Sequence, residues 1–183
     1  MGRVVAVCGL PGSGKGVFCA QAVNRNIPVL SMGDVVREEV AARGLTESPE
    51  NVGRVALQLR TLFGEDVIAE RLLTELITVL NTEPMIIIDG IRSLAEYTFF
   101  SERIENISLL AIVSLRETRK QRISLRGRGE DGNDLDFENR EARELGWGIE
   151  TLIEISDESI ANDRSLEEAK ERFDEWLEVS ASV

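Results

Sequence analysis

Residues 3–16 read RVVAVC-GLPGSGKG, a β-branched hydrophobic run that leads directly into a glycine-rich loop with one lysine. The run from Arg3 to Cys8 is typical of a short buried strand, and residues 14–24 favour a helix. The loop between them fits the spacing G-x-x-x-x-G-K in the strand–loop–helix context that a phosphate-binding loop needs. A glycine-rich turn with a chance lysine is the alternative, but spacing and context together favour phosphate binding.

The chemistry of this loop predicts a nucleoside triphosphate as its ligand. Glycines adopt backbone conformations that other residues avoid, so successive N–H groups turn toward phosphate oxygens, and the next helix adds its positive N-terminus. Lys15 is expected to reach the β- and γ-phosphates as a point charge. The predicted nucleotide-binding residues are Gly9, Leu10, Pro11, Gly12, Ser13, Gly14, Lys15, Gly16 and Val17.

Beyond the loop, short hydrophobic runs alternate with helical patterns along the chain. The further expected strands are residues 28–31, 84–89, 109–115 and 159–161. Strands that alternate with helices form right-handed crossovers and a parallel sheet covered on both faces. We therefore predict an α/β fold with a five-stranded parallel sheet and a single domain over residues 1–183.

The charge of the chain argues against nucleic-acid binding. Its 183 residues include 21 Lys and Arg and 33 Asp and Glu, for a net charge of −12, and this field repels nucleic-acid phosphates. No hydrophobic run reaches the roughly 18 residues of a membrane span, and the N-terminus does not resemble a signal peptide. We expect a cytoplasmic protein, a monomer or weak homo-oligomer, with Cys8 and Cys19 as reduced core thiols rather than a disulfide.

A second group of polar residues follows the next strands. Residues 31–37, SMGDVVR, end in Arg37, and a guanidinium at the carboxyl edge of a parallel sheet is well placed for bidentate phosphate contact. The strand over residues 84–89 ends in Asp89, which can hold Mg²⁺ directly or through water. The sequence therefore predicts a second phosphate site and a metal site at this edge.

Residues 32–80 are predicted to be mostly helical and to cover the phosphate acceptor. Arg54 and Arg60 lie in this segment, and for each of them an exposed helix face is an equally good interpretation. Arg92 follows the strand that ends in Asp89 and is a further candidate to meet the acceptor.

A basic cluster stands out in this acidic chain: Arg116, Arg119, Lys120, Arg122, Arg126 and Arg128. Arg119, Arg122 and Arg126 share one helical face. The cluster borders a Gly- and Asp-rich loop over residues 127–136. A charge run is commonly a solvated face, but this one opposes the overall charge and favours a lid over the phosphates. The predicted lid spans residues 122–143, with Arg140 and Arg143 on the far side of its loop.

The phosphate loop is similar to that of the adenylate kinase group, G-x-P-G-x-G-K-G-T, which this chain matches from Gly9 to Gly16, whereas Val17 replaces the threonine. Residues 31–37 resemble the S-T-G-D-x-x-R segment of nucleoside monophosphate kinases, in which the arginine grips the phosphate of the acceptor. With the candidates above, the resemblance implies an acceptor site that consists of Ser31, Gly33, Asp34, Arg37, Arg60 and Arg92.

The lid is also similar to this family. Arg122 and Arg126 match the R-x-x-x-R that begins the family's lid, and the short lid loop resembles that of the short-lid kinases. Residues 89–92, DGIR, are one residue shorter than the family's D-G-F-P-R. The resemblance implies ATP and Mg²⁺ as cofactors, and catalytic charge stabilisation by Lys15, Arg122, Arg126, Arg140 and Arg143.

Over nearly the full chain, the sequence resembles an archaeal group of adenylate kinase-related P-loop proteins, the UPF0200-like group. The motifs G-x-P-G-S-G-K-G, S-M-G-D-V-V-R-E-E, D-G-I-R-S and R-E-L-G-W-G-I occur in this order between Gly9 and Ile149. Residues 160–168, IANDRSLEE, also resemble the N-x-G-S-L-E-E segment of dephospho-CoA kinases, in which the last strand meets the purine base.

These features predict an ATP-binding phosphotransferase that moves the γ-phosphate to a nucleoside monophosphate-like acceptor. A phosphate acceptor is already anionic and needs little help from a base, which suits a chain without histidine. Two alternatives stay open. Val17 and the short motif at residues 89–92 are compatible with a P-loop NTPase or regulatory nucleotide-binding protein. A hydroxyl acceptor would make the protein dephospho-CoA kinase-like, with Asp34 as the nearby acid.

Overall fold

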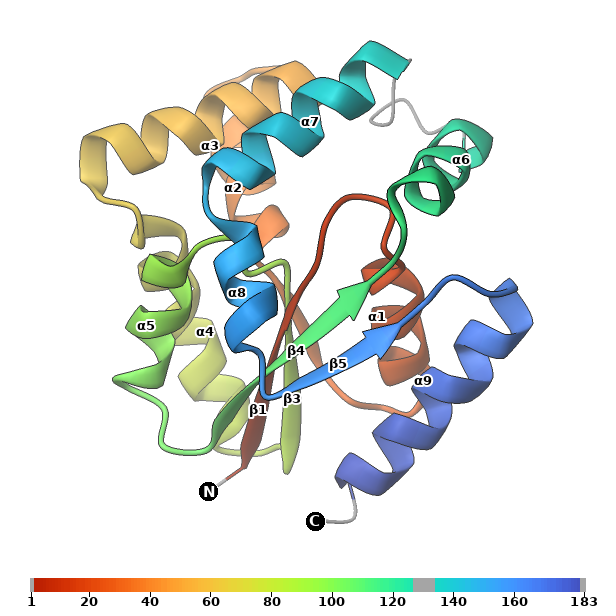
Figure 1. The fold of residues 1–183 in the computed structure, drawn as a ribbon. Coiled ribbons are helices and arrows are strands. Elements are labelled where there is room, and N and C mark those ends of the chain that lie inside the picture. Colours follow the sequence, from red (N-terminus) through yellow and green to blue (C-terminus); the bar gives the residue numbers. More distant parts are fainter. Residues whose placement is uncertain (1, 127–133, 182–183) are drawn as a thin grey trace.

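The computed structural model describes residues 2–126 and 134–181 and contains a five-stranded sheet in which all paired strands are parallel (Figure 1). The strand order is β2-β3-β1-β4-β5, which places β1 at the centre. The prediction of an α/β fold with five parallel strands is confirmed. The strands are β1 (Arg3–Cys8), β2 (Val29–Ser31), β3 (Met85–Asp89), β4 (Ile107–Val113) and β5 (Glu158–Ala161).

Nine α-helices lie within the described part of the chain. Helices α1 and α9 cover one face of the sheet, and α4, α5 and α8 cover the other (Figure 1). Helices α2, α3 and α7 lie toward the carboxyl ends of the strands. The helices are α1 (Lys15–Asn24), α2 (Met32–Ala42), α3 (Pro49–Phe63), α4 (Val67–Leu80), α5 (Leu94–Ser101), α6 (Arg116–Arg126), α7 (Asp134–Gly146), α8 (Ile149–Ile155) and α9 (Leu166–Ala181).

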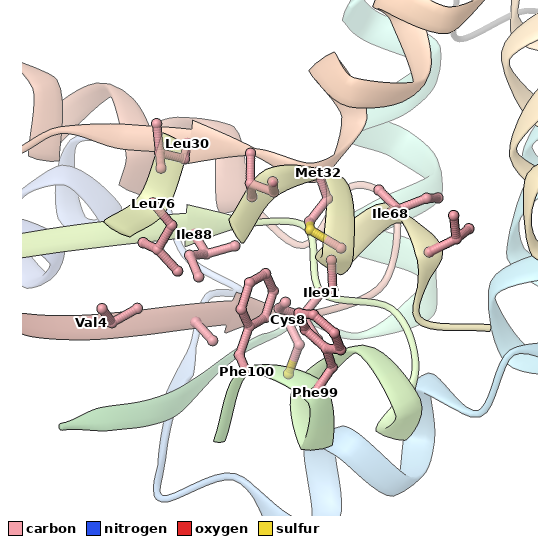
Figure 2. Close-up of a cluster of buried hydrophobic side chains, with 14 of the residues drawn as sticks. Val4, Cys8, Leu30, Met32, Ile68, Leu76, Ile88, Ile91, Phe99 and Phe100 are labelled. Atoms are coloured by element: carbon pink, nitrogen blue, oxygen red, sulfur yellow. The ribbon is translucent and has the colours of Figure 1, made fainter. Parts of the chain in front are cut away.

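Successive residues of the central strand enter two separate hydrophobic clusters. Val4 lies in the cluster under α4 and α5, and Val5 in the cluster under α1 and α9. Figure 2 shows the first cluster, which Phe100 of α5 shares with Leu76 of α4 and Ile88 of β3. Because both faces of a parallel sheet are buried, its strands are continuously hydrophobic and polar side chains are confined to the strand ends.

The pattern of residues 137–155 favours a helix, which Gly146 and Gly148 weaken, and the structure divides this stretch into two helices. The chain breaks between α7 and α8, where Gly148 has a φ of 83°, a left-handed conformation that favours glycine. Helix α7 lies alongside α3, and α8 turns toward the sheet (Figure 1). The break therefore brings the end of α7 to the carboxyl edge of the sheet.

Cys8 and Cys19 are both buried free thiols, as predicted. Within residues 2–126 and 134–181, every helix is too short or too polar to cross a membrane.

Candidate active site

The phosphate loop of residues 9–14 joins the end of β1 to the start of α1. Gly9 and Gly14 have φ angles of 145° and 110°. A Cβ at Gly9 would collide with the carbonyl oxygen of Ile112, and one at Gly14 with the side-chain amide of Asn162. Only glycine fits both the backbone conformation and the space at these positions, so the loop packs closely against β4 and the end of β5.

Lys15 begins α1 and folds back over the loop. Its Nζ donates hydrogen bonds to the carbonyl oxygen of Gly9 and, at 3.3 Å, to that of Leu10. Burial lowers the pKa of Lys15, while the carboxylates of Glu144 and Asp89 act in the opposite direction. The ammonium group therefore lies within electrostatic range of both acids.

Asp89 ends β3, in register with Val7 of β1 and Ser31 of β2. Its Oδ1 is buried and has no hydrogen-bond partner among the described residues. A carboxylate oxygen without a donor suits a hard cation, and Mg²⁺ in phosphate sites takes one or two carboxylates together with water and substrate phosphates. Asp89 thus fits the predicted metal position, although the described residues contain no group of three or more metal-binding side chains.

The first turn of α1 lacks the hydroxyl that phosphate loops usually supply to the metal. A Cβ at Gly16 would meet no atom within 4 Å, and Val17 packs partly against the cluster under α1 and α9. Any metal at this site would therefore be held without a side-chain oxygen from residues 16 and 17.

A cavity next to the phosphate loop is lined by five arginines, and we call it the arginine pocket. Lys15 lies within electrostatic range of two of these arginines, Arg92 and Arg140. The lining residues are Met32, Gly33, Val36, Arg37, Pro49, Val52, Gly53, Ala56, Arg60, Ile68, Arg92, Arg140, Arg143 and Trp147. Residues of the predicted acceptor segment and of the predicted lid therefore meet around a single cavity.

Trp147 contacts three of these arginines. The guanidinium carbons of Arg60, Arg143 and Arg92 lie 4.3, 5.7 and 5.9 Å from the centre of its ring. Arg60 also pairs with the buried Glu96 at 2.6 Å, and only 8% of its own side chain is exposed. Arg60 is therefore an interior residue of the pocket and not part of an exposed helix face.

Glu144 of α7 is the acidic residue at the centre of the site. Only 2% of its side chain is exposed, and its Oε1 accepts hydrogen bonds from Arg92 Nη1 at 2.5 Å and Arg140 Nε at 3.3 Å. Burial opposes ionisation, but the positive charges of Arg92, Lys15 and Arg140 outweigh it and hold the pKa of Glu144 below its usual range. Glu144 is therefore an ionised carboxylate between the phosphate loop and the arginine pocket.

Of the five arginines that line the pocket, Arg143 forms no ion pair within the described residues, whereas the other four do. Its Nε is buried and has no hydrogen-bond partner among the described residues. Burial and the neighbouring Arg92 lower the pKa of Arg143, against an opposite effect of Glu144. A buried guanidinium N–H without an acceptor suits an anionic ligand in the pocket.

Of the residues predicted from the SMGDVVR segment, Gly33 and Arg37 line the pocket, whereas Ser31 and Asp34 do not. Ser31 ends β2 and precedes α2, and Gly33 lies beneath the guanidinium of Arg37. Asp34 is 61% exposed and accepts a hydrogen bond from Arg37 Nη2 at 2.5 Å. In contrast, Arg54 is exposed and does not line the pocket.

The predicted lid residues fall into two groups. Arg140 and Arg143 line the arginine pocket, whereas Arg122 donates hydrogen bonds to the carbonyl oxygens of Asn162 at 2.8 Å and Arg164 at 3.0 Å. Arg122 thus lies beside the connection that follows β5, apart from the pocket. The side chain of Arg126 and residues 127–133 of the predicted lid loop lie outside the described residues.

Sequence reasoning missed three residues that organise the site, Glu144, Trp147 and Asn162, and placed a fourth, Arg119, only in the basic cluster. Glu144 and Trp147 reach the site only because α7 ends over the pocket. Asn162 Nδ2 donates to the carbonyl oxygen of Ser13 at 2.8 Å, and Arg119 Nη1 donates to that of Pro11 at 3.2 Å. The resemblances mark the segments that contain Glu144, Trp147 and Asn162, but nothing in the sequence indicates their contacts.

Comparisons with known proteins find related sequences. A family model described as an AAA domain matches residues 8–141. A UPF0200 protein of Methanothrix thermoacetophila is 41% identical over 180 residues, which cover 96% of this chain and 97% of that protein. A UPF0200 protein of Thermococcus onnurineus is 37% identical and covers 96% of each chain.

Solved structures are similar in fold at low sequence identity. The protein TT1252 from Thermus thermophilus aligns with a TM-score of 0.64 at 20% identity and covers 97% of both chains. Shikimate kinase from Bacteroides thetaiotaomicron aligns with a TM-score of 0.59 at 16% identity, covering 96% of this chain and 98% of that one. These likenesses show the P-loop kinase-like fold.

Proposed function

Since the chain belongs to the UPF0200 family of P-loop proteins, we propose that it transfers the γ-phosphoryl group of ATP to an acceptor that carries a phosphate, such as a nucleoside monophosphate. The phosphate loop binds the donor, and the arginine pocket binds the acceptor. The predicted lid arginines Arg140 and Arg143 act on the transferred group from the pocket side.

The observation that carries this proposal is the position of Glu144, which forms ion pairs with Arg92 at 2.5 Å and Arg140 at 3.3 Å and also interacts electrostatically with Lys15. Lys15 belongs to the donor loop, and the two arginines belong to the pocket. A phosphoryl group passes between two bound ligands only when the donor and acceptor sites adjoin, because transfer depends on positioning. A protein that only binds or hydrolyses a triphosphate has no need of a second cationic pocket at this place.

The chemistry then follows from charge and position. An acceptor phosphate is a nucleophile without prior deprotonation, so the absence of histidine from the chain is no obstacle. Lys15, Arg92 and Arg140 stabilise the charge that develops on the equatorial oxygens during transfer. Asp89 would hold Mg²⁺, which would neutralise charge on the triphosphate. Arg37 and Arg143 orient the phosphate of the acceptor by hydrogen bonds.

A second candidate function is nucleotide hydrolysis without an acceptor. Val17 is compatible with it, because a missing hydrogen bond to a charged phosphate costs about 1.5–3 kcal/mol and weakens the donor site. A hydroxyl acceptor is less well supported, because Asp34 is largely exposed and paired with Arg37.

The test is ADP release from Mg·ATP by the purified protein, alone and with each of a panel of nucleoside monophosphates and dephospho-CoA. We expect one monophosphate to raise turnover far above the blank, and Arg37→Ala to abolish that stimulation. Arg54→Ala is the matched control, since Arg54 is exposed outside the pocket and its loss leaves the stimulation intact. Turnover that is equal with every acceptor but is lost in Lys15→Ala would replace the transferase by an NTPase.

A further inference from the structure

Arg119 of α6 is buried, in contrast to the solvated face on which a basic helix residue usually lies. Only 4% of its side chain is exposed. Its guanidinium donates hydrogen bonds to three segments: to the carbonyl oxygen of Ser114 at 3.2 Å, to the carbonyl oxygen of Pro11 at 3.2 Å, and to Glu141 Oε1 at 2.5 Å. One planar group thus joins the end of β4, the phosphate loop and α7.

The contact between the phosphate loop and α6 extends to the backbone. A Cβ at Gly12 would lie 2.6 Å from the carbonyl oxygen of Arg119 and 3.0 Å from its Cα. Gly12 also has a φ of 80°. Because backbone atoms cannot move aside as a flexible side chain can, the loop and the first half of α6 must shift together.

The third partner, Glu141, lies on the helix that carries the phosphate-binding side chains of the pocket. Glu141 is itself nearly buried. Arg140, Arg143 and Glu144 are its neighbours on α7 and belong to the site described above. A displacement of Pro11 or of Arg119 therefore changes the support of the turn of α7 from which these residues extend.

We infer that Arg119 is a positioning residue that couples the phosphate loop to α7, so that a nucleotide in the loop stabilises the arrangement of the arginine pocket. The inference rests on the proposed function, because it requires a nucleotide in the loop. The guanidinium is well suited to this role: its fixed fork of five N–H donors serves three acceptors at once, which the single ammonium group of a lysine cannot reproduce.

Arg116 provides a matched control on the same helix. Its Nε donates to the other carboxylate oxygen of Glu141 at 2.7 Å. Its guanidinium carbon lies 5.5 Å from the centre of the Phe137 ring, close to the 5.7 Å for Arg119. It also pairs with Glu138. No hydrogen bond joins Arg116 to the phosphate loop in the described structure, so it holds α7 without linking it to the nucleotide.

The experiment is hydrogen exchange of the α7 backbone amides, measured with and without saturating Mg·AMP-PNP. The variants are Arg119→Lys, Glu141→Gln and the control Arg116→Lys. Calorimetric titration of each variant with Mg·AMP-PNP establishes that its phosphate loop is occupied, and circular dichroism establishes that it is folded. Glu141→Gln removes the same link from the side of α7 and decides the question if Arg119→Lys fails to fold.

In the wild-type protein and in Arg116→Lys, we expect the nucleotide to slow exchange in α7 by about fivefold or more, within the range of typical coupling between sites. In Arg119→Lys and Glu141→Gln, we expect less than about a twofold effect at full occupancy of the loop. Equal slowing in all four proteins, or no slowing in the wild type despite bound nucleotide, overturns the coupling. Those results leave the proposed transfer intact, because acceptor-dependent turnover tests it separately.

Discussion

Glu144 Oε1 lies 2.5 Å from Arg92 Nη1, so a carboxylate of α7 neutralises an arginine that the proposed acceptor needs. We expect Glu144→Gln to bind inorganic phosphate more tightly, by about tenfold, since a hydrogen bond to a charged group contributes about 1.5–3 kcal/mol. The quenching of Trp147 fluorescence, in a Trp176→Phe background, measures this affinity. Glu138→Gln on the same helix is the control, because Glu138 pairs with Arg116 and Lys120 instead. Unchanged or weaker phosphate binding in Glu144→Gln would contradict this view of the pocket.

The same pair predicts a dependence of stability on pH. The pKa of Glu144 is lower in the folded protein than the ordinary glutamate value of 4.5. Ionised Glu144 therefore stabilises the fold above that value, and this contribution is lost as the pH falls through the lowered pKa. We expect urea denaturation to show wild type more stable than Glu144→Gln at pH 7, with the difference shrinking below about pH 4.5. A difference that is constant from pH 7 to pH 3 would show that the charge of Glu144 contributes nothing.

Val17 occupies the place of the threonine in the similar kinase loops, and Val17→Thr should restore its hydroxyl. The expected result is about 10-fold tighter binding of AMP-PNP, the equivalent of one hydrogen bond to a charged phosphate. The gain should be the same in EDTA as with Mg²⁺, because the added hydroxyl donates to the phosphate and does not act through the metal. Isothermal titration with and without Mg²⁺ makes the comparison. Unchanged affinity in both conditions, or a gain that is lost in EDTA, would contradict a contact between this hydroxyl and phosphate.

Gly53 of α3 lies directly against the guanidinium of Arg143. A Cβ at Gly53 would collide with Arg143 Nη1, the far end of a flexible side chain, so Arg143 must move while the helix stays. Gly53→Ala should therefore weaken phosphate binding severalfold without loss of stability, since alanine in a helix is favoured over glycine by about 1 kcal/mol. Gly146→Ala in α7, where a Cβ meets nothing within 4 Å, is the control. A lower melting temperature with unchanged phosphate affinity would be the opposite of this prediction.

The two thiols should be unreactive in the folded protein. Burial raises the pKa of Cys8 from 9.0 to about 11, against an opposing effect of Lys15, and burial raises the pKa of Cys19 still further. At pH 8 few thiolates exist, so DTNB should react slowly with native protein and fast with both thiols in urea. Because the folded pKa of Cys8 is raised, its neutral thiol favours folding below pH 9, and this contribution is lost as the pH rises toward 11. Rapid reaction of native protein would contradict the burial of both residues.

The sequence predicts best those features that are specified by residues close together in the chain. The phosphate loop, its strand and its helix are specified within residues 3–24, and alternation of strands and helices is sufficient to predict a parallel sheet. The arrangement of α7 depends instead on the break at Gly148 and on packing against α3. For this reason Glu144 and Trp147 could not be assigned to the site beforehand.

The arginines illustrate the same limit. Arg54 and Arg60 are six residues apart on one predicted helix, and charge alone cannot tell which of them faces inward. The structure buries Arg60 against Trp147 and Glu96 and leaves Arg54 exposed. Arg119 was grouped with a solvated or lid-forming cluster, because its three acceptors come from segments distant in sequence.

The most direct test of phosphoryl transfer follows the labelled group itself. ATP that carries ³²P at the γ-position is incubated with the protein, Mg²⁺ and the acceptor that stimulates ADP release most, and the products are separated by chromatography. The account predicts that the label appears in the acceptor as its diphosphate, and that Lys15→Ala and Arg37→Ala abolish this product. Label found only in inorganic phosphate, at a rate independent of the acceptor, would contradict the account and make the protein a nucleotide hydrolase.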